Sequence, residues 1–419
     1  MTRLPLLLVT CGVLTLCGGL VLAQEKDEPR RAEPDPWIKD DDGALARLGY
    51  VAVGRIPFGD GHDSVRMQED LGELPLLFVE TAHFRLCCEL PAFDMPRDKE
   101  RRARLLPELE ALSRKLPKLD PRKLRSVDPW LRAHLFAQRL EDLYSEFARI
   151  AGVEDAAFPP ADQTFYFRGD APPRWRDPWM GRGPFLGQRG KFLVALFRKT
   201  STCGRYLSTF TGAGRDSPTR WYFEKSDAAL FATAIDFADG AYRDDEALYA
   251  HVIHNVTHCL IDALRGYSYD VPVWWSEGLC HWLRREHCPE HNDFEAIKET
   301  DKRAYTVFDW PEKVRQRVGN GLVRPLHDIG DRFRCDDFDL VDHMTCWSRV
   351  DFLLSQFPAE RFAAFLRGMK GLVDARGAAP SPEQVCAAQR KLIEEVFGCD
   401  PDRLDEQWRE WVTRNRRRK

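Results

Sequence analysis

The most informative stretch of this chain reads His254-Asn255-Val256-Thr257-His258. It lies within residues 245–264, a segment that predicts a helix, with Asp244 or Asp245 capping its start and Gly266 ending it in the left-handed conformation. Residues four positions apart lie on the same face of a helix, so the two imidazoles can converge on a single cation.

A carboxylate that could complete such a site follows on a second predicted helix. Residues 259–276 separate the second histidine from Glu277, which lies within Trp274-Trp275-Ser276-Glu277-Gly278-Leu279. Two histidines and one glutamate make a tetrahedral zinc site with three protein ligands and one position left for water. That open position distinguishes a catalytic zinc site from a structural one.

The two motifs together resemble the gluzincin zinc metallopeptidases. That family combines HExxH, a gap of about eighteen residues and a third-ligand glutamate in a segment such as WLxEG. The match covers His254, His258, Glu277 and Gly278. The resemblance implies a zinc ion held by the first three of these residues, strands before the zinc-site helix and a helical lobe after it.

The chain departs from the family at Asn255, where gluzincins have the glutamate that deprotonates zinc-bound water. An amide has no useful pKa, so a general-base contribution of about 10²- to 10⁴-fold, roughly 3 to 5 kcal/mol, is absent. Three hypotheses remain open. The first is a zinc-binding protein with little or no peptidase activity, which binds peptide or cell-envelope material. The others are an active peptidase with a non-standard base and a metal-free interaction protein.

Four further residues lie near the motifs in sequence. Asp262, one turn after the second histidine, is either an acceptor for a ligand imidazole or a solvated helix charge. His281, one turn after the predicted third ligand, either orients a ligand, replaces water on the metal or lies at the surface. His251 packs or lines the cleft. His343 falls where the resemblance places a tyrosine that polarises the substrate carbonyl.

The remaining chain predicts an α+β fold with a small mixed or antiparallel sheet beside the zinc-site helix. Apolar or alternating runs indicate the strands; these are residues 76–79, 83–86, 164–167, 192–197 and 229–235. After residue 299 the chain becomes mostly helical; the clearest segments are 345–354, 359–369, one from Ser381 and one from Pro401. We therefore expect an α+β lobe over residues 43–300 and a helical lobe over residues 301–419.

The N-terminus predicts export. Arg3 precedes an uncharged apolar run that ends in Val21-Leu22-Ala23, which indicates a signal peptide over residues 1–23. An uncleaved membrane anchor is the alternative. Residues 24–42 are charged and contain proline, so we expect a linker there.

Composition and cysteine count fit an exported globular protein. The 419 residues are 43% apolar with a net charge of -4, which gives no reason to expect nucleic-acid binding or a membrane span beyond the signal segment. An even number of cysteines follows the signal peptide, which predicts several disulfides. These are Cys87, Cys88, Cys203, Cys259, Cys280, Cys288, Cys335, Cys346, Cys386 and Cys399. Substrate and oligomeric state have no signature in the sequence.

We predict that the mature chain begins at Gln24, because the apolar run ends in a small-residue cleavage pattern. N-terminal sequencing of protein recovered from its native cell checks this. Recovery of intact Met1 in a soluble cytoplasmic fraction would show the export interpretation to be wrong.

Overall fold

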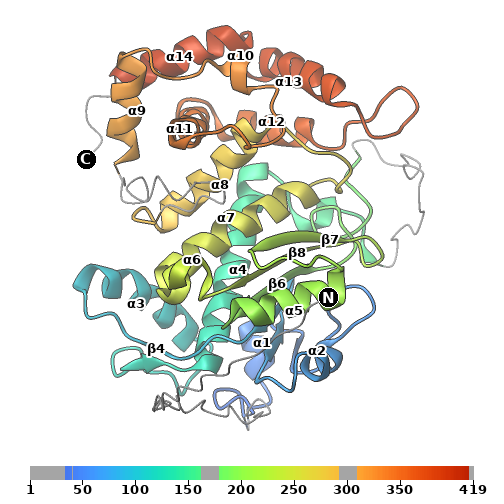
Figure 1. The fold of residues 1–419 in the computed structure, drawn as a ribbon, viewed down its shortest axis with the longest axis vertical. Coiled ribbons are helices and arrows are strands. Elements are labelled where there is room, and N and C mark those ends of the chain that lie inside the picture. The colour runs from blue at the N-terminus through green and yellow to red at the C-terminus, as the bar shows by residue number, and fades with distance from the viewer. Residues whose placement is uncertain (1–33, 40, 162–178, 292–308, 415–419) are drawn as a thin grey trace, which may run out of the picture.

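The computed structural model describes residues 34–39, 41–161, 179–291 and 309–414 (Figure 1). The predicted signal peptide, most of the linker, the predicted strand at 164–167 and the predicted lobe boundary near residue 300 lie outside these residues. No described helix is both long enough and apolar enough to cross a bilayer.

A six-stranded mixed sheet forms the centre of the α+β part, as predicted. Its strand order is β1-β2-β3-β6-β8-β7, and only the β3–β6 and β6–β8 pairs are parallel. The strands are β1 (Ala52–Val53), β2 (Leu77–Glu80), β3 (Phe84–Cys88), β6 (Phe192–Phe197), β7 (Thr219–Phe223) and β8 (Ala228–Ala234). A separate pair joins β4 (Phe93–Asp94) to β5 (Ser126–Val127). The sequence did not predict the short strand β1 or the edge strand β7.

Helices cover both faces of the sheet and fill the C-terminal part of the chain (Figure 1). Before the sheet is complete the chain forms α1 (Ala44–Leu48), α2 (Ser64–Asp70), α3 (Lys99–Ser113), α4 (Pro129–Ala151) and α5 (Thr200–Thr211). The site region contains α6 (Phe237–Gly240), α7 (Asp245–Ala263) and α8 (Val273–His287). The remaining helices are α9 (Trp310–Gly319), α10 (Leu326–Ile329), α11 (Leu340–Gln356), α12 (Ala359–Met369), α13 (Pro382–Phe397) and α14 (Pro401–Arg414).

Alternating residues of the central strands enter two different apolar clusters, because successive side chains of a strand point to opposite faces. On β6, Val194 packs in the cluster that contains α4 and α7 residues, whereas Ala195 packs in the cluster that contains α5 residues. The α4–α7 cluster continues into the helices from α8 to α14. The sheet and the C-terminal helices therefore share one core.

The prediction of several disulfides is wrong for this structure, since none of the ten cysteines after the signal segment, all of which lie in the described residues, forms a disulfide bond. Most of them are buried among apolar side chains; Cys88, Cys259 and Cys280, for example, belong to the core shared by the sheet and the helices. A free cysteine packs as a small apolar residue, and this role accounts for their burial.

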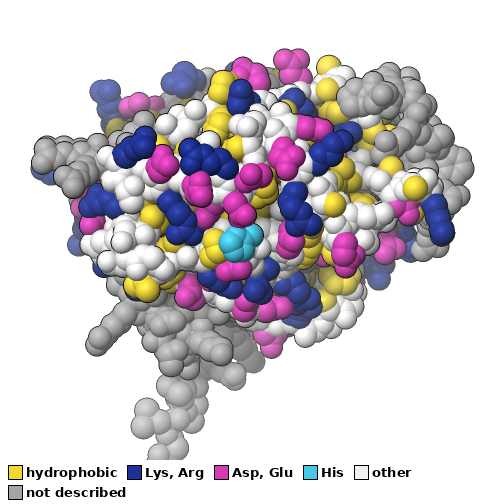
Figure 2. All heavy atoms as spheres, turned by 90° about the horizontal axis from the view of Figure 1, so that it is seen from above, with side chains coloured by type: hydrophobic (Ala, Val, Ile, Leu, Met, Phe, Trp, Pro, Cys, Tyr) yellow, Lys and Arg dark blue, Asp and Glu magenta, His cyan; other side chains and the backbone are white. Residues whose placement is uncertain are grey.

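The C-terminal helices present a surface of mixed charge. Figure 2 views the molecule from above, and acidic and basic side chains are interspersed on the face that it shows. Some of these charges pair at the surface, as Arg390 does with Asp331 at 2.7 Å. Exposed pairs of this kind contribute little to stability.

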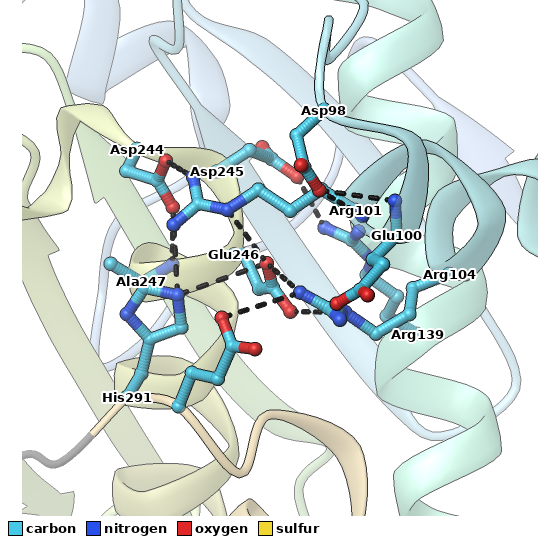
Figure 3. Close-up of polar contacts among 11 residues, drawn as sticks. Asp98, Glu100, Arg101, Arg104, Arg139, Asp244, Asp245, Glu246, Ala247 and His291 are labelled. Carbon is cyan, nitrogen blue, oxygen red and sulfur yellow. Dashed lines mark hydrogen bonds and ion pairs between the residues drawn. The ribbon is translucent and has the colours of Figure 1, made fainter. Parts of the chain in front are cut away.

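Three consecutive acidic residues fix the start of α7, the helix that carries the histidine motif (Figure 3). Asp244 caps the helix by accepting a hydrogen bond from the main-chain N–H of Ala247. Asp245 and Glu246 follow in the first turn. Negative charge there stabilises the helix because it is attracted to the positive end of the helix dipole. All three pair with arginines of α3 or α4: Arg101 with Asp244, Arg104 with Glu246, and Arg132 and Arg139 with Asp245.

We predict that Asp245→Asn lowers the free energy of unfolding by about 3 to 5 kcal/mol, because it leaves the charge of the buried Arg132 without its carboxylate partner. Urea denaturation measures the change. As a matched control, Asp70→Asn breaks the exposed Arg66–Asp70 pair and should cost less than about 1 kcal/mol. Equal effects of the two substitutions would contradict a special role for the buried network.

Candidate metal centre

Helices α7 and α8 bring the three predicted metal ligands together. His254 Nε2 lies 3.4 Å from Glu277 Oε1, and His258 Nε2 lies 2.9 Å from Glu277 Oε2. One donor atom from each residue lies within 4.8 Å of the other two. Three such donors around a zinc ion lie about 2.0 to 2.2 Å from one point, so the arrangement fits a bound cation after small side-chain adjustments.

Packing at the start of α8 holds Glu277 in place. Trp274 and Trp275 are fully buried, and Trp274 Nε1 donates a hydrogen bond to Gln389 Oε1 of α13 at 2.8 Å. Trp275 packs edge-on against Phe365 of α12. The adjacent Gly278 lets α8 approach α11 closely, since a Cβ atom at this position would lie 2.5 Å from the carbonyl oxygen of Cys346. The tryptophans and the glycine of the motif are thus positioning residues.

The electrostatic environment favours the protonation states that bind metal. Burial lowers the pKa of His254 and of His258, and the charge of Arg220 lowers the pKa of His258 further. Burial alone would raise the pKa of Glu277, but the surrounding histidines outweigh burial and hold that pKa well below its ordinary value. The direction of each pKa shift favours the deprotonated form of the group, and deprotonated imidazoles and carboxylates are the forms that coordinate a cation.

Asn255 follows His254 on α7, and its side chain is fully buried. Its Nδ2 donates to the main-chain carbonyl of His251 at 3.1 Å, and its Oδ1 accepts from Arg220 Nη1 at 3.3 Å. His251 is also buried, lies 3.2 Å from Thr233 Oγ1 through its Nε2 and stacks on Tyr242. Packing is therefore the role that the structure gives to His251.

Arg220 is a residue of this site that sequence reasoning missed. It lies on β7, an edge strand in which two polar residues are followed by three aromatic ones, and this strand precedes the histidine motif in the chain. No motif or spacing connects it with position 255. Only the pairing of β7 with β8 brings its guanidinium to Asn255.

His281 and His343 lie on the Oε1 side of Glu277. Each ring has a nitrogen 3.2 Å from Glu277 Oε1, and those two nitrogens, His281 Nε2 and His343 Nδ1, lie 2.9 Å apart. The interpretation of His281 as a surface residue is wrong, because its side chain is completely buried between α8 and α11. A role for His343 in polarising a substrate carbonyl stays a prediction.

Asp262 is half-buried. The structure supports neither of its predicted roles, as an acceptor for a ligand imidazole or as a solvated helix charge. Burial raises the pKa of its carboxyl group, an effect that the charge of Lys370 opposes. Lys370 is itself buried, which lowers its pKa to about 8, and its Nζ donates to the main-chain carbonyl of Asp262 at 3.1 Å. The structure therefore associates Asp262 with Lys370 and α12 more closely than with a ligand imidazole.

No protein-family model and no curated protein matches this chain. The assignment of the site therefore depends on the motif and on the geometry of its donor atoms.

We predict that Gly278→Ala destabilises the protein by about 1 to 3 kcal/mol, because the added methyl group would collide with the main chain of α11. Urea denaturation gives the value. Gly319→Ala, at the end of α9 where nothing lies within 4 Å, is the matched control and should be neutral or slightly stabilising. A neutral Gly278→Ala would show that close packing between α8 and α11 does not hold Glu277.

Proposed function

We propose that this chain is an exported, metallopeptidase-like protein that binds zinc through His254, His258 and Glu277 and hydrolyses peptides weakly or not at all. The observation that supports this most directly is the convergence of one donor atom from each of these residues within 4.8 Å, next to a buried amide at position 255. Peptide or cell-envelope material is the class of ligand that we propose for it.

The three ligands and Asn255 have separate roles in this proposal. The two imidazoles and the carboxylate would hold a zinc ion, which would act as a Lewis acid and lower the pKa of a bound water towards about 7. Peptide cleavage also needs a group that accepts a proton and then delivers it to the leaving nitrogen. Asn255 can do neither, because its amide has no titratable proton in the useful range.

Arg220 makes the loss of the base harder to reverse. A glutamate at position 255 would lie beside the guanidinium that now donates to Asn255 Oδ1 at 3.3 Å. An adjacent cation stabilises the ionised form of a carboxyl group and lowers its pKa, which makes the carboxylate a poorer base. Restoring the residue of the family pattern is therefore insufficient while Arg220 remains.

We predict that the zinc-loaded natural protein shows negligible peptidase activity, that Asn255→Glu gains little, and that Asn255→Glu with Arg220→Ala gains more. The double variant should recover part of the general-base factor of about 10²- to 10⁴-fold. Cleavage of a mixed peptide library, with and without a chelator, measures the activity.

The matched control is Asn255→Gln with Arg220→Ala, which differs from the active candidate only in its missing carboxylate and should be inactive. Strong cleavage of peptides by the natural protein that a chelator abolishes would contradict this proposal and support an active peptidase. If the natural protein contains no zinc and binds no added zinc, the hypothesis of a metal-free interaction protein would be supported instead.

A further inference from the structure

The side of Glu277 that faces α11 contains a second set of metal-ligand atoms. Glu277 Oε1, His281 Nε2 and His343 Nδ1 form a triangle with edges of 3.2, 3.2 and 2.9 Å. Donor atoms about 2.1 Å from one cation, with angles between 90° and tetrahedral, are separated by roughly 3.0 to 3.4 Å. The triangle therefore has nearly the dimensions of a three-ligand face around a cation.

The geometry points to a second cation site formed by Glu277, His281 and His343, with the Glu277 carboxylate bridging two cations. Oε2 lies 2.9 Å from His258 Nε2, whereas Oε1 lies 3.2 Å from the nearest nitrogens of His281 and His343. His254 Nε2 is 3.4 Å from Oε1, so it lies between the two sets of ligands. The inference shares Glu277 with the proposed zinc site and to that extent rests on the proposed function. Two imidazoles and a carboxylate suit divalent transition-metal ions, including Zn²⁺.

Two rigid helices preorganise this second set. Glu277 and His281 are separated by one turn on α8 and share a face, and His343 comes from the first turns of α11. His281 and His343 are both buried. Trp310 packs edge-on against His281, and Phe338 does the same against His343. Ligand atoms that cannot relax into water lose little conformational freedom when a cation binds.

We expect the second cation to bind more weakly than the first, because two cations held beside one carboxylate repel each other. The two sites also share one carboxylate, so each cation receives only part of its negative charge. We therefore expect two binding events of unequal affinity.

Metal titration of the tag-free chain without residues 1–23 tests this inference. After removal of metal by a chelator, Zn²⁺ is added in a calorimeter, and the zinc retained after dialysis is counted per chain. The natural protein should bind two equivalents. His281→Gln and His343→Gln, on separate helices, should each bind one, as should His254→Gln; Glu277→Gln should weaken both sites.

His287→Gln is the matched control. This residue lies on α8 but pairs with Glu146, outside both sets of ligands, so the variant should still bind two equivalents. Circular dichroism confirms that each variant is folded. A second measurement needs no substitution, because two Cu²⁺ ions about 4 Å apart in the natural protein would give a spin-coupled paramagnetic resonance spectrum.

The outcomes separate this inference from the proposed function. The natural protein could bind one equivalent of Zn²⁺ that His254→Gln loses but His281→Gln and His343→Gln retain. This result would overturn the second site and leave the proposed function intact. If the single equivalent is instead lost in His281→Gln and His343→Gln but retained in His254→Gln, the second site would be supported and the proposed zinc ligands overturned. One equivalent lost in all three variants would indicate a single shared cation and overturn the second site. Failure of the natural protein to bind any Zn²⁺ would overturn both.

Discussion

One buried carboxylate connects the elements of this site. Glu277 of α8 contacts two histidines of α7 through both of its oxygens, and it contacts His343 of α11 through Oε1. An ionised group in such a place is costly unless neighbouring groups stabilise its charge. His254, His258 and His281 provide that stabilisation and hold the pKa of Glu277 well below the ordinary range. A bound cation would stabilise the same charge further.

The rest of the fold holds α7 and α8 in fixed positions relative to this carboxylate. Charged pairs with α3 and α4 anchor the first turn of α7. The other face of the sheet packs separately on α5, so the α4–α7 cluster can extend without interruption into the C-terminal helices. Gly278 lets α11 approach α8 closely enough for His343 to reach Glu277. The site therefore lies within the core that joins the sheet to these helices.

The helix spacing of His254 and His258, the later Glu277 and the mixed sheet could be predicted from the sequence, because each depends on local periodicity or on a motif of fixed length. Contacts that depend on the tertiary fold could not. Arg220 reaches Asn255 only through strand pairing, and the burial of His281 depends on the packing of α11. The cysteine count predicted disulfides, whereas apolar packing accounts for most of those residues. An even number of cysteines does not show which of them face each other.

Anomalous diffraction from zinc-soaked crystals, recorded on both sides of the zinc absorption edge, would locate a cation bound to these residues. We expect an edge-dependent peak within about 2.0 to 2.2 Å of His254 Nε2, His258 Nε2 and a Glu277 carboxylate oxygen. The absence of such a peak at saturating zinc, with the imidazoles still hydrogen-bonded to Glu277, would contradict zinc binding by these three residues. The site would then be a buried hydrogen-bonded cluster that resembles a metal centre only in its residues.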